Sequence, residues 1–185
     1  MSLKKIKNYH HYYEIVRAEV MICRHCKKII KTTFLDLGYA PPSNSYRTKK
    51  DMGYPEKYYP LRLKICESCW LVQTENFFNA SEIFDPDYAY FSSTSSTWVA
   101  HAERFAKKII KNRKLDKNSL IFEIASNDGY LLKNFISSGI PCLGIEPTKS
   151  TAKEAIKKGI PVLMDFFGEA LAKKLVDEGK KADLV

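Results

Sequence analysis

Four of the five cysteines in this chain fall into two C-x-x-C pairs, and this spacing constrains the fold more than any other feature of the sequence. Cys23 and Cys26 form the first pair, and Cys66 and Cys69 form the second. A disulfide framework requires an oxidising compartment, and a thioredoxin-type site requires one pair beside a βαβ unit. Two matched pairs are instead typical of zinc, because each tight turn presents two thiolates to one tetrahedral ion.

The residues that flank the second pair indicate the fold of this metal site. Residues 59–65 alternate apolar and charged side chains, which predicts a strand that enters Cys66, and residues 70–73 predict the strand that leaves Cys69. This pattern predicts a zinc ribbon. Four cysteine ligands leave no position for water, so we expect a structural zinc. Four free cysteines with coincidental spacing, or His25 as a competing ligand, remain the alternatives.

Composition and charge narrow the class of protein. The 185 residues are 45% hydrophobic and 28% charged, as in ordinary globular proteins, which excludes a disordered or collagen-like chain. The sequence contains no apolar run near the roughly 20 residues of a membrane helix, and the residues after the basic start are polar. We therefore expect a cytoplasmic protein without a membrane partner. The net charge of +9 raises the question of a polyanionic partner.

The second half of the sequence alternates predicted strands and helices, as in a series of βαβ units. A helical pattern begins at Trp98, a short apolar strand covers residues 120–124, and further strands are predicted at 142–146, 162–165 and 182–185. Gly139, Gly159 and Gly179 mark three helix ends at a step of 20 residues. This order predicts a parallel sheet with right-handed crossovers.

The expected fold class is α/β, with two domains joined by a loop. Residues 1–80 are predicted to form a zinc-ribbon-like β domain, because the excess of basic residues and most of the tyrosines lie before residues 80–90. Residues 81–97 are predicted to be a linker or active-site loop, and residues 98–185 a partial Rossmann-like domain. Because the predicted sheet stops at its fourth strand, we expect a truncated chain that is inactive by itself.

The turn after the strand at residues 120–124 is the candidate ligand site. Glu123 lies near the end of this strand and Glu146 ends the next one, and ligands of such sheets bind at the carboxyl ends of the strands. The dinucleotide fingerprint G-x-G-x-x-G is absent, and a short anionic turn suits a cationic ligand without phosphate, such as S-adenosylmethionine. The alternative is that both glutamates are ordinary polar residues at strand ends.

Several segments together resemble one known family. They are the four cysteines, Leu35-Asp-Leu-Gly-Tyr-Ala-Pro-Pro-Ser-Asn-Ser45, Tyr88-Ala-Tyr-Phe-Ser-Ser-Thr-Ser95, Glu123-Ile-Ala-Ser-Asn-Asp-Gly-Tyr-Leu-Leu132 and Gly144-Ile-Glu-Pro147. Over about residues 20–150 the chain resembles the S-adenosylmethionine-dependent C-methyltransferases of nucleotide-linked deoxyketosugars. These enzymes carry an N-terminal zinc-binding domain, a methyltransferase domain and a C-terminal domain. Many relatives have glycine in place of Ala125.

The resemblance implies roles for particular residues. The methionine part of the cofactor would be held by Glu123, Ala125, Ser126, Asn127 and Gly129, and its ribose by Glu146. Residues 84–97 are either a solvated linker or a loop over the cleft that contacts the substrate through Tyr88, Tyr90, Ser93 and Ser95. The catalytic base is unassigned and is expected beyond Val185.

The resulting prediction is methyl transfer from S-adenosylmethionine to a carbon of a nucleotide-linked deoxyketosugar. The expected partner is the nucleotide-sugar rather than a nucleic acid, and the oligomeric state is left open. Two alternatives of other classes remain. The basic first half favours a zinc-ribbon module that binds nucleic acid, and the βαβ pattern also fits a dinucleotide-dependent reductase domain.

Overall fold

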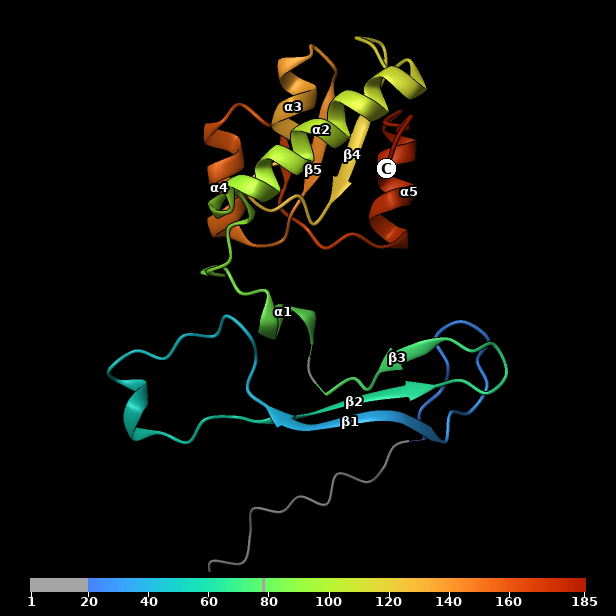
Figure 1. Cartoon of the computed structure of the whole chain (residues 1–185), viewed down its shortest axis with the longest axis vertical. Coiled ribbons are helices and arrows are strands. Elements are labelled where there is room, and N and C mark those ends of the chain that lie inside the picture. The colour runs from blue at the N-terminus through green and yellow to red at the C-terminus, as the bar shows by residue number, and fades with distance from the viewer. Residues whose placement is uncertain (1–19, 78) are drawn as a thin grey trace, which may run out of the picture. The chain divides into compact units, whose positions relative to one another are not determined.

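The computed structural model describes residues 20–77 and 79–185, which form two compact units (Figure 1). The first unit contains residues 20–40 and 58–77, and the second contains residues 41–57 and 79–185. Residues 41–57 and 81–97 thus group with the second unit, whereas the sequence analysis assigned the former to the zinc-binding domain and the latter to a separate loop. Hydrogen bonds within the second unit, such as the one from Asn44 Nδ2 to the Tyr88 hydroxyl, accompany this grouping.

The first unit is built on an antiparallel sheet with the order β1–β2–β3. Its strands are β1 (Thr32–Ala40), β2 (Tyr59–Ile65) and β3 (Val72–Thr74). The bounds of β2 agree with the prediction. The sequence analysis does not predict β1, although apolar and polar residues alternate from Leu35 to Tyr39; nearly all side chains of this strand are exposed.

The cysteines themselves form the core of the first unit. Cys23, Ile30 and Cys66 are buried, and Met21, Cys26 and Cys69 pack against them. Figure 1 shows the two cysteine-bearing turns together at one end of the sheet. Such a small apolar core cannot by itself stabilise a unit of this size, which is why small domains of this kind depend on a metal.

The second unit contains a parallel sheet with the order β4–β5–β6. The strands are β4 (Ile121–Ile124), β5 (Cys142–Ile145) and β6 (Val162–Leu163). An isolated parallel bridge joins Ile121 to Leu184 on the other side of β4. The predicted strand near the end of the chain thus pairs with β4, although it forms one bridge only. The predicted α/β fold class, with an antiparallel N-terminal sheet and a Rossmann-like parallel sheet, is confirmed.

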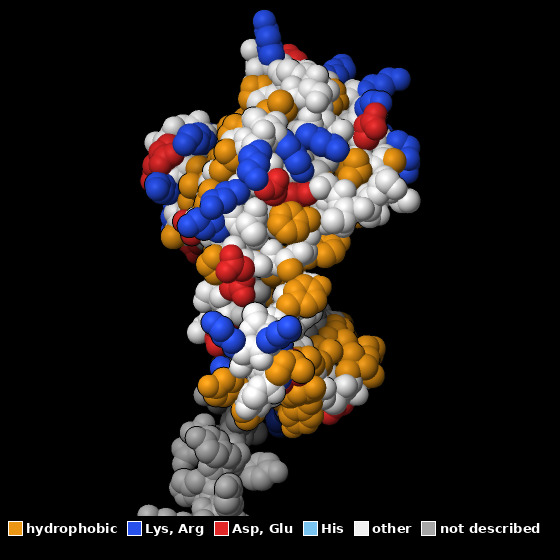
Figure 2. All heavy atoms as spheres, turned by 90° about the vertical axis from the view of Figure 1, so that its left-hand side faces the viewer, with side chains coloured by type: hydrophobic (Ala, Val, Ile, Leu, Met, Phe, Trp, Pro, Cys, Tyr) orange, Lys and Arg blue, Asp and Glu red, His pale blue; other side chains and the backbone are white. Residues whose placement is uncertain are grey.

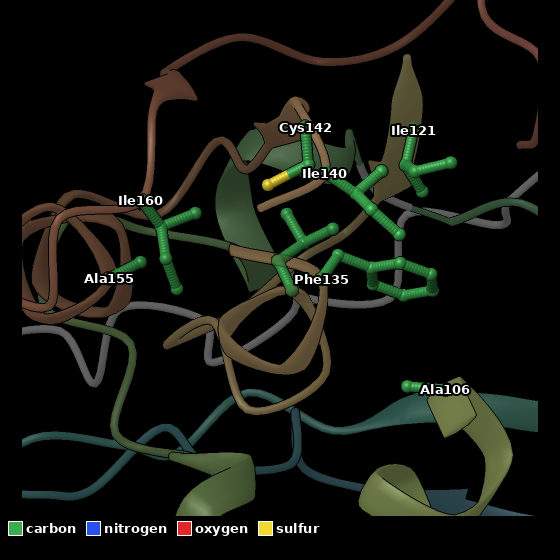
Figure 3. Packing of buried hydrophobic residues seen from close by; sticks show 8 residues of the cluster. Ala106, Ile121, Phe135, Ile140, Cys142, Ala155 and Ile160 are labelled. Carbon is green, nitrogen blue, oxygen red and sulfur yellow. The ribbon is translucent and has the colours of Figure 1, made fainter. Parts of the chain in front are cut away.

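Helices cover both faces of the parallel sheet. They are α2 (Ser96–Arg113), α3 (Leu132–Ser137), α4 (Lys149–Lys157) and α5 (Glu169–Asp177). On one face, Ala106 of α2, Phe135 of α3 and Ala155 of α4 pack with strand residues that include Ile121 and Cys142 (Figure 3). On the other face, α5 packs Leu171 and Leu175 against Phe122 and Ile145. Neighbouring residues of one strand therefore belong to opposite cores.

The three predicted helix ends are confirmed by their geometry. Gly139, Gly159 and Gly179 all have positive φ, between +71° and +78°. In each case the next residue donates its N–H back to the last turn, as Ile140 does to the carbonyl of Phe135. Glycine is favoured here because this left-handed conformation costs other residues energy.

Three short helices lie in the connecting segments, namely η1 (Asp51–Gly53), α1 (Ala80–Ile83) and η2 (Ser92–Thr94). In the part of the chain that the structure describes, no helix has both the length and the apolar character that a membrane span requires. On the face of the second unit seen in Figure 2, basic and acidic side chains are interspersed rather than gathered into one basic patch.

Candidate functional site

The four paired cysteines meet at one point, as their spacing predicts. Their sulfur atoms all lie within 4.8 Å of one another. Cys23 Sγ is 3.6 Å from Cys69 Sγ, and Cys26 Sγ is 3.5 Å from Cys66 Sγ. A tetrahedral zinc with bonds of ~2.3 Å separates its sulfur ligands by about 3.8 Å. The two separations given above differ from this value by only a few tenths of an ångström, so the cluster suits Zn²⁺, and among the described residues His25 takes no part in it.

The two cysteine turns have the same backbone geometry. In the first turn the N–H of Lys27 donates to the carbonyl of Cys23 at 3.0 Å, and in the second the N–H of Trp70 donates to the carbonyl of Cys66 at 2.8 Å. Lys27 and Trp70 follow the second cysteine of their pairs, and both adopt positive φ, +62° and +63°. A lysine and a tryptophan give no sequence signal for this conformation, in which glycine is the usual residue.

Backbone N–H groups in these turns favour the thiolate form of the buried cysteines. Hydrogen bonds led by the backbone of Cys26 lower the pKa of Cys23 to about 5. The backbone of Ser68 is the main cause that lowers the pKa of Cys66. The backbone of Leu71 also acts to lower the pKa of Cys69, but desolvation and the neighbouring thiols outweigh it and raise the value to about 12. A divalent cation bound between the four sulfurs offsets the repulsion between neighbouring thiolates, because it favours the thiolate form of all four cysteines.

Gln73 supports the metal site from outside the ligand set. This buried side chain donates from Nε2 to Cys23 Sγ at 3.4 Å, and its Oε1 accepts from the backbone N–H of Arg24 at 3.1 Å. Such outer contacts orient metal ligands. The sequence analysis does not identify Gln73, because its only signal is one polar residue in a short strand.

The turn after β4 is shaped by left-handed backbone. Ala125, Asn127 and Gly129 have φ values of +58°, +49° and +75°. Ser126 is fully buried above Gly144 of β5, where an added Cβ would lie 2.4 Å from Ser126 Oγ. Strand β5 therefore carries glycine at position 144, because the turn packs directly on the backbone of this strand.

Glu146 holds the turn against the end of β5. Its carboxylate is buried, and Oε2 accepts from the backbone N–H of Asn127 at 2.8 Å. Oε1 accepts from the N–H of Thr148 at 2.9 Å and also from the Thr148 hydroxyl. A carboxylate has about four acceptor positions, so these bonds leave little capacity for a ribose. The structure thus gives Glu146 a role in shaping the turn, and its predicted ribose contact stays a prediction.

Glu123 is the titratable group of the site with the strongest perturbation. Burial, followed by the charges of Asp128 and Glu146, raises its pKa to about 8, and a backbone hydrogen bond with Leu132 offsets part of this effect. Within the described residues, Glu123 Oε2, Ser126 Oγ and Asp128 Oδ1 are buried without hydrogen-bond partners. An acidic edge with unpaired acceptors can bind a cationic ligand that donates hydrogen bonds.

The raised pKa of Glu123 predicts that the second unit loses stability as the pH rises. The folded state keeps the proton up to about pH 8, whereas the unfolded chain releases it near the ordinary value of 4.5. The stabilising contribution of the protonated carboxyl is therefore complete below about pH 4.5 and is lost as the pH rises through 8. The slope is at most ~1.4 kcal/mol per pH unit.

Urea unfolding measured between about pH 5 and 8 tests this prediction. Trp98 emission in a Trp70→Phe background reports on the second unit, because these are the two tryptophans of the chain. Glu123→Gln has no proton to lose and is expected to show a flatter dependence than the parent protein. Identical slopes in the two proteins would contradict the assignment.

The predicted substrate segment lies beside this turn, but most of its polar groups already have partners. The Tyr88 hydroxyl accepts from Asn44 Nδ2 at 3.2 Å, the Ser93 hydroxyl donates to Asp128, and Ser95 Oγ caps α2 by accepting from the N–H of Trp98. Tyr90 differs, because its side chain is exposed. The structure therefore brings Tyr90 and Ser93 to the turn, places Ser95 at a helix start, and leaves Tyr90 as the member most accessible to a substrate.

Two comparisons with known proteins bear on the function of the chain. Residues 23–84 match a family of zinc binding domains named Methyltransf_13. The chain is 22% identical over 163 residues to C-methyltransferase NovU of Streptomyces niveus, and this match covers 88% of the chain and 39% of the relative. The chain thus spans about two fifths of the length of this curated relative. The match to the zinc binding domains and the match to the C-methyltransferase together confirm that the chain resembles the N-terminal region of the sugar C-methyltransferase family.

Proposed function

We propose that the protein transfers a methyl group from S-adenosylmethionine to a carbon of a nucleotide-linked deoxyketosugar. The chain described here would contribute the zinc-binding unit and the first part of the cofactor site. The observation that carries the proposal is the acidic turn at the ends of β4 and β5, in a chain related to a C-methyltransferase.

Charge and hydrogen-bonding capacity at the turn support a cationic cofactor. Glu123, Asp128 and Glu146 surround the turn, and the unpaired oxygen of Glu123 can accept from an ammonium group. S-adenosylmethionine carries such a group and supplies an electrophilic methyl on its sulfonium. A pyrophosphate would meet the carboxyl groups of Asp128 and Glu146 here as well as the protonated carboxyl of Glu123, which argues against a dinucleotide.

The residues of this chain would bind and orient rather than perform the proton transfer. Glu123 would pair with the cationic part of the cofactor, and the left-handed turn from Ala125 to Gly129 would let the backbone approach it. Tyr90, whose side chain is exposed, is the residue of the neighbouring segment best placed to contact the sugar. Alignment of the substrate carbon with the methyl group would supply much of the rate. The zinc would be structural, because four cysteines fill a tetrahedral shell.

Calorimetric titration of the purified chain with S-adenosylhomocysteine, S-adenosylmethionine and NAD⁺ tests the proposal. We expect both adenosyl ligands to bind, and Glu123→Gln to weaken their affinity by 1.5–3 kcal/mol, or about 10- to 150-fold, as for hydrogen bonds to charged groups. Glu103→Gln is the matched control, because Glu103 pairs with Lys107 on the exposed face of α2.

Two outcomes would count against the proposal. Preference for NAD⁺ over the adenosyl ligands would favour the reductase alternative. Equal affinity of the Glu123→Gln variant and the parent would move the cofactor contact away from this turn.

A further inference from the structure

The segment that precedes α2 is fixed to the turn after β4 by one amide side chain. Asn127 Oδ1 accepts from the backbone N–H of Ser92 at 2.8 Å, and Asn127 Nδ2 donates to the carbonyl of Tyr90 at 3.0 Å. Asn127 is 9% exposed, and its bond to Ser92 is buried, while its bond to Tyr90 is partly buried. The amide thus replaces the pair of main-chain hydrogen bonds that a neighbouring strand would provide.

The next residue of the turn holds the same segment through its carboxylate. Asp128 Oδ2 accepts from the backbone N–H of Ser93 at 3.3 Å and also from the Ser93 hydroxyl. Lys158, which follows α4, places Nζ 2.8 Å from the Asp128 carbonyl and 3.4 Å from Oδ2. Asp128 is 1% exposed, and the Lys158 ammonium offsets part of the cost of burying this side chain.

The start of α4 fixes the other end of the segment. The backbone N–H of Ser150 donates to the carbonyl of Pro86 at 3.0 Å, and Ser150 Oγ donates to the carbonyl of Tyr88 at 2.8 Å. Residues 86–93 therefore run from the beginning of α4 to the turn after β4. Both attachment points lie at the carboxyl end of the parallel sheet, to which the arrow of β4 points in Figure 1.

We propose that Asn127 and Asp128 are positioning residues. They hold the Tyr90–Ser93 segment beside the turn after β4 and thereby complete one wall of the ligand site. The proposal rests on the proposed function, and it differs from the expectation that the Asn127 side chain binds the cofactor directly. The Asn127 amide uses both of its polar atoms on the segment, and Asp128 uses Oδ2, whereas Asp128 Oδ1 has no hydrogen-bond partner among the described residues. Their effect on ligand binding is therefore transmitted through Tyr90 and Ser93.

A double-mutant cycle between Ser93→Ala and Asp128→Asn separates positioning from direct contact. Affinity for S-adenosylhomocysteine is measured by calorimetry on the purified chain. We expect each single variant to lose affinity about tenfold, as for one hydrogen bond to a charged group, and the double variant to be no weaker than Asp128→Asn alone. If Ser93→Ala binds within about twofold of the parent and the two losses multiply, Asp128 contacts the ligand itself and the proposal is wrong.

A second measurement needs no ligand and so distinguishes failure of this proposal from failure of the proposed function. Trp98 lies five residues after Ser93, 5.9 Å from the ring of Tyr130. In a Trp70→Phe background, release of the segment is expected to increase acrylamide quenching of Trp98 in Ser93→Ala and Asp128→Asn alike. Ser137→Ala is the matched control, because its exposed hydroxyl donates to the Lys133 carbonyl within α3.

The combination of results decides the outcome. Increased quenching without any adenosyl-ligand binding in the parent would support the fixed segment and overturn the proposed function. Unchanged quenching in both variants, with cooperative urea unfolding retained, would show that neither bond positions the segment and would overturn this inference.

Discussion

Replacing Cys66 by serine is expected to unfold the first unit while the second unit stays folded. Cys66 is buried beside Cys23 in a core that contains few apolar side chains besides the cysteines. Zinc binding contributes on the order of 10 kcal/mol to the folding of small structural sites, which exceeds what so small a core can supply. Loss of one ligand should therefore remove both the metal and the folded sheet β1–β2–β3.

Metal analysis combined with tryptophan emission measures this result. The parent should contain one zinc per chain, and Cys66→Ser well below one. Trp70 lies in the turn after Cys69 and reports on the first unit, whereas Trp98 reports on the second. Cys142→Ala is the control, because Cys142 is buried in the other core and should leave the zinc content unchanged. Full zinc occupancy in Cys66→Ser would contradict the four-cysteine site.

Gly129→Ala is expected to destabilise the second unit by about 2–4 kcal/mol, the sum of an overpacked core and a strained backbone. An added Cβ would lie 2.2 Å from Ile160 Cδ1 and 3.2 Å from Ala155 Cβ. Both neighbours belong to the buried cluster in Figure 3, and φ at this position is +75°. Urea unfolding followed by Trp98 emission measures the loss.

Ala125→Gly provides a control with the opposite sign in the same turn. Ala125 has φ of +58°, a conformation that disfavours alanine relative to glycine, so this change should stabilise the unit by about 1 kcal/mol. If both substitutions destabilise to the same extent, the left-handed geometry assigned to the turn is wrong.

The sequence alone predicted those features whose physical cause lies in residues close together in the chain. The spacing of Cys23, Cys26, Cys66 and Cys69 predicts the metal cluster, because two residues between ligands fit one tight turn. The glycines at 139, 159 and 179 predict three helix ends, because few other residues adopt positive φ there without cost. The order of strands and helices that these signals mark was enough to identify the α/β class.

Other features depend on contacts between residues far apart in the chain, so no local pattern could reveal them. The sequence shows that Ser93, Asn127 and Asp128 are polar, but only the folded chain pairs Asn127 and Asp128 with the segment 35 residues earlier. Gln73 likewise reaches Cys23 across 50 residues.

The sequence by itself thus determined the four-cysteine cluster, the α/β class and the position of the turn after β4, because these follow from residue spacing and backbone preference. Only the tertiary structure decided how the polar residues of that turn are used. Glu146 is occupied in holding the turn, and Asn127 and Asp128 hold the Tyr90–Ser93 segment, while Glu123 keeps an unpaired oxygen. The physical reason is that a buried polar group must find a partner, and which partner is within reach depends on the folded chain rather than on the residue type.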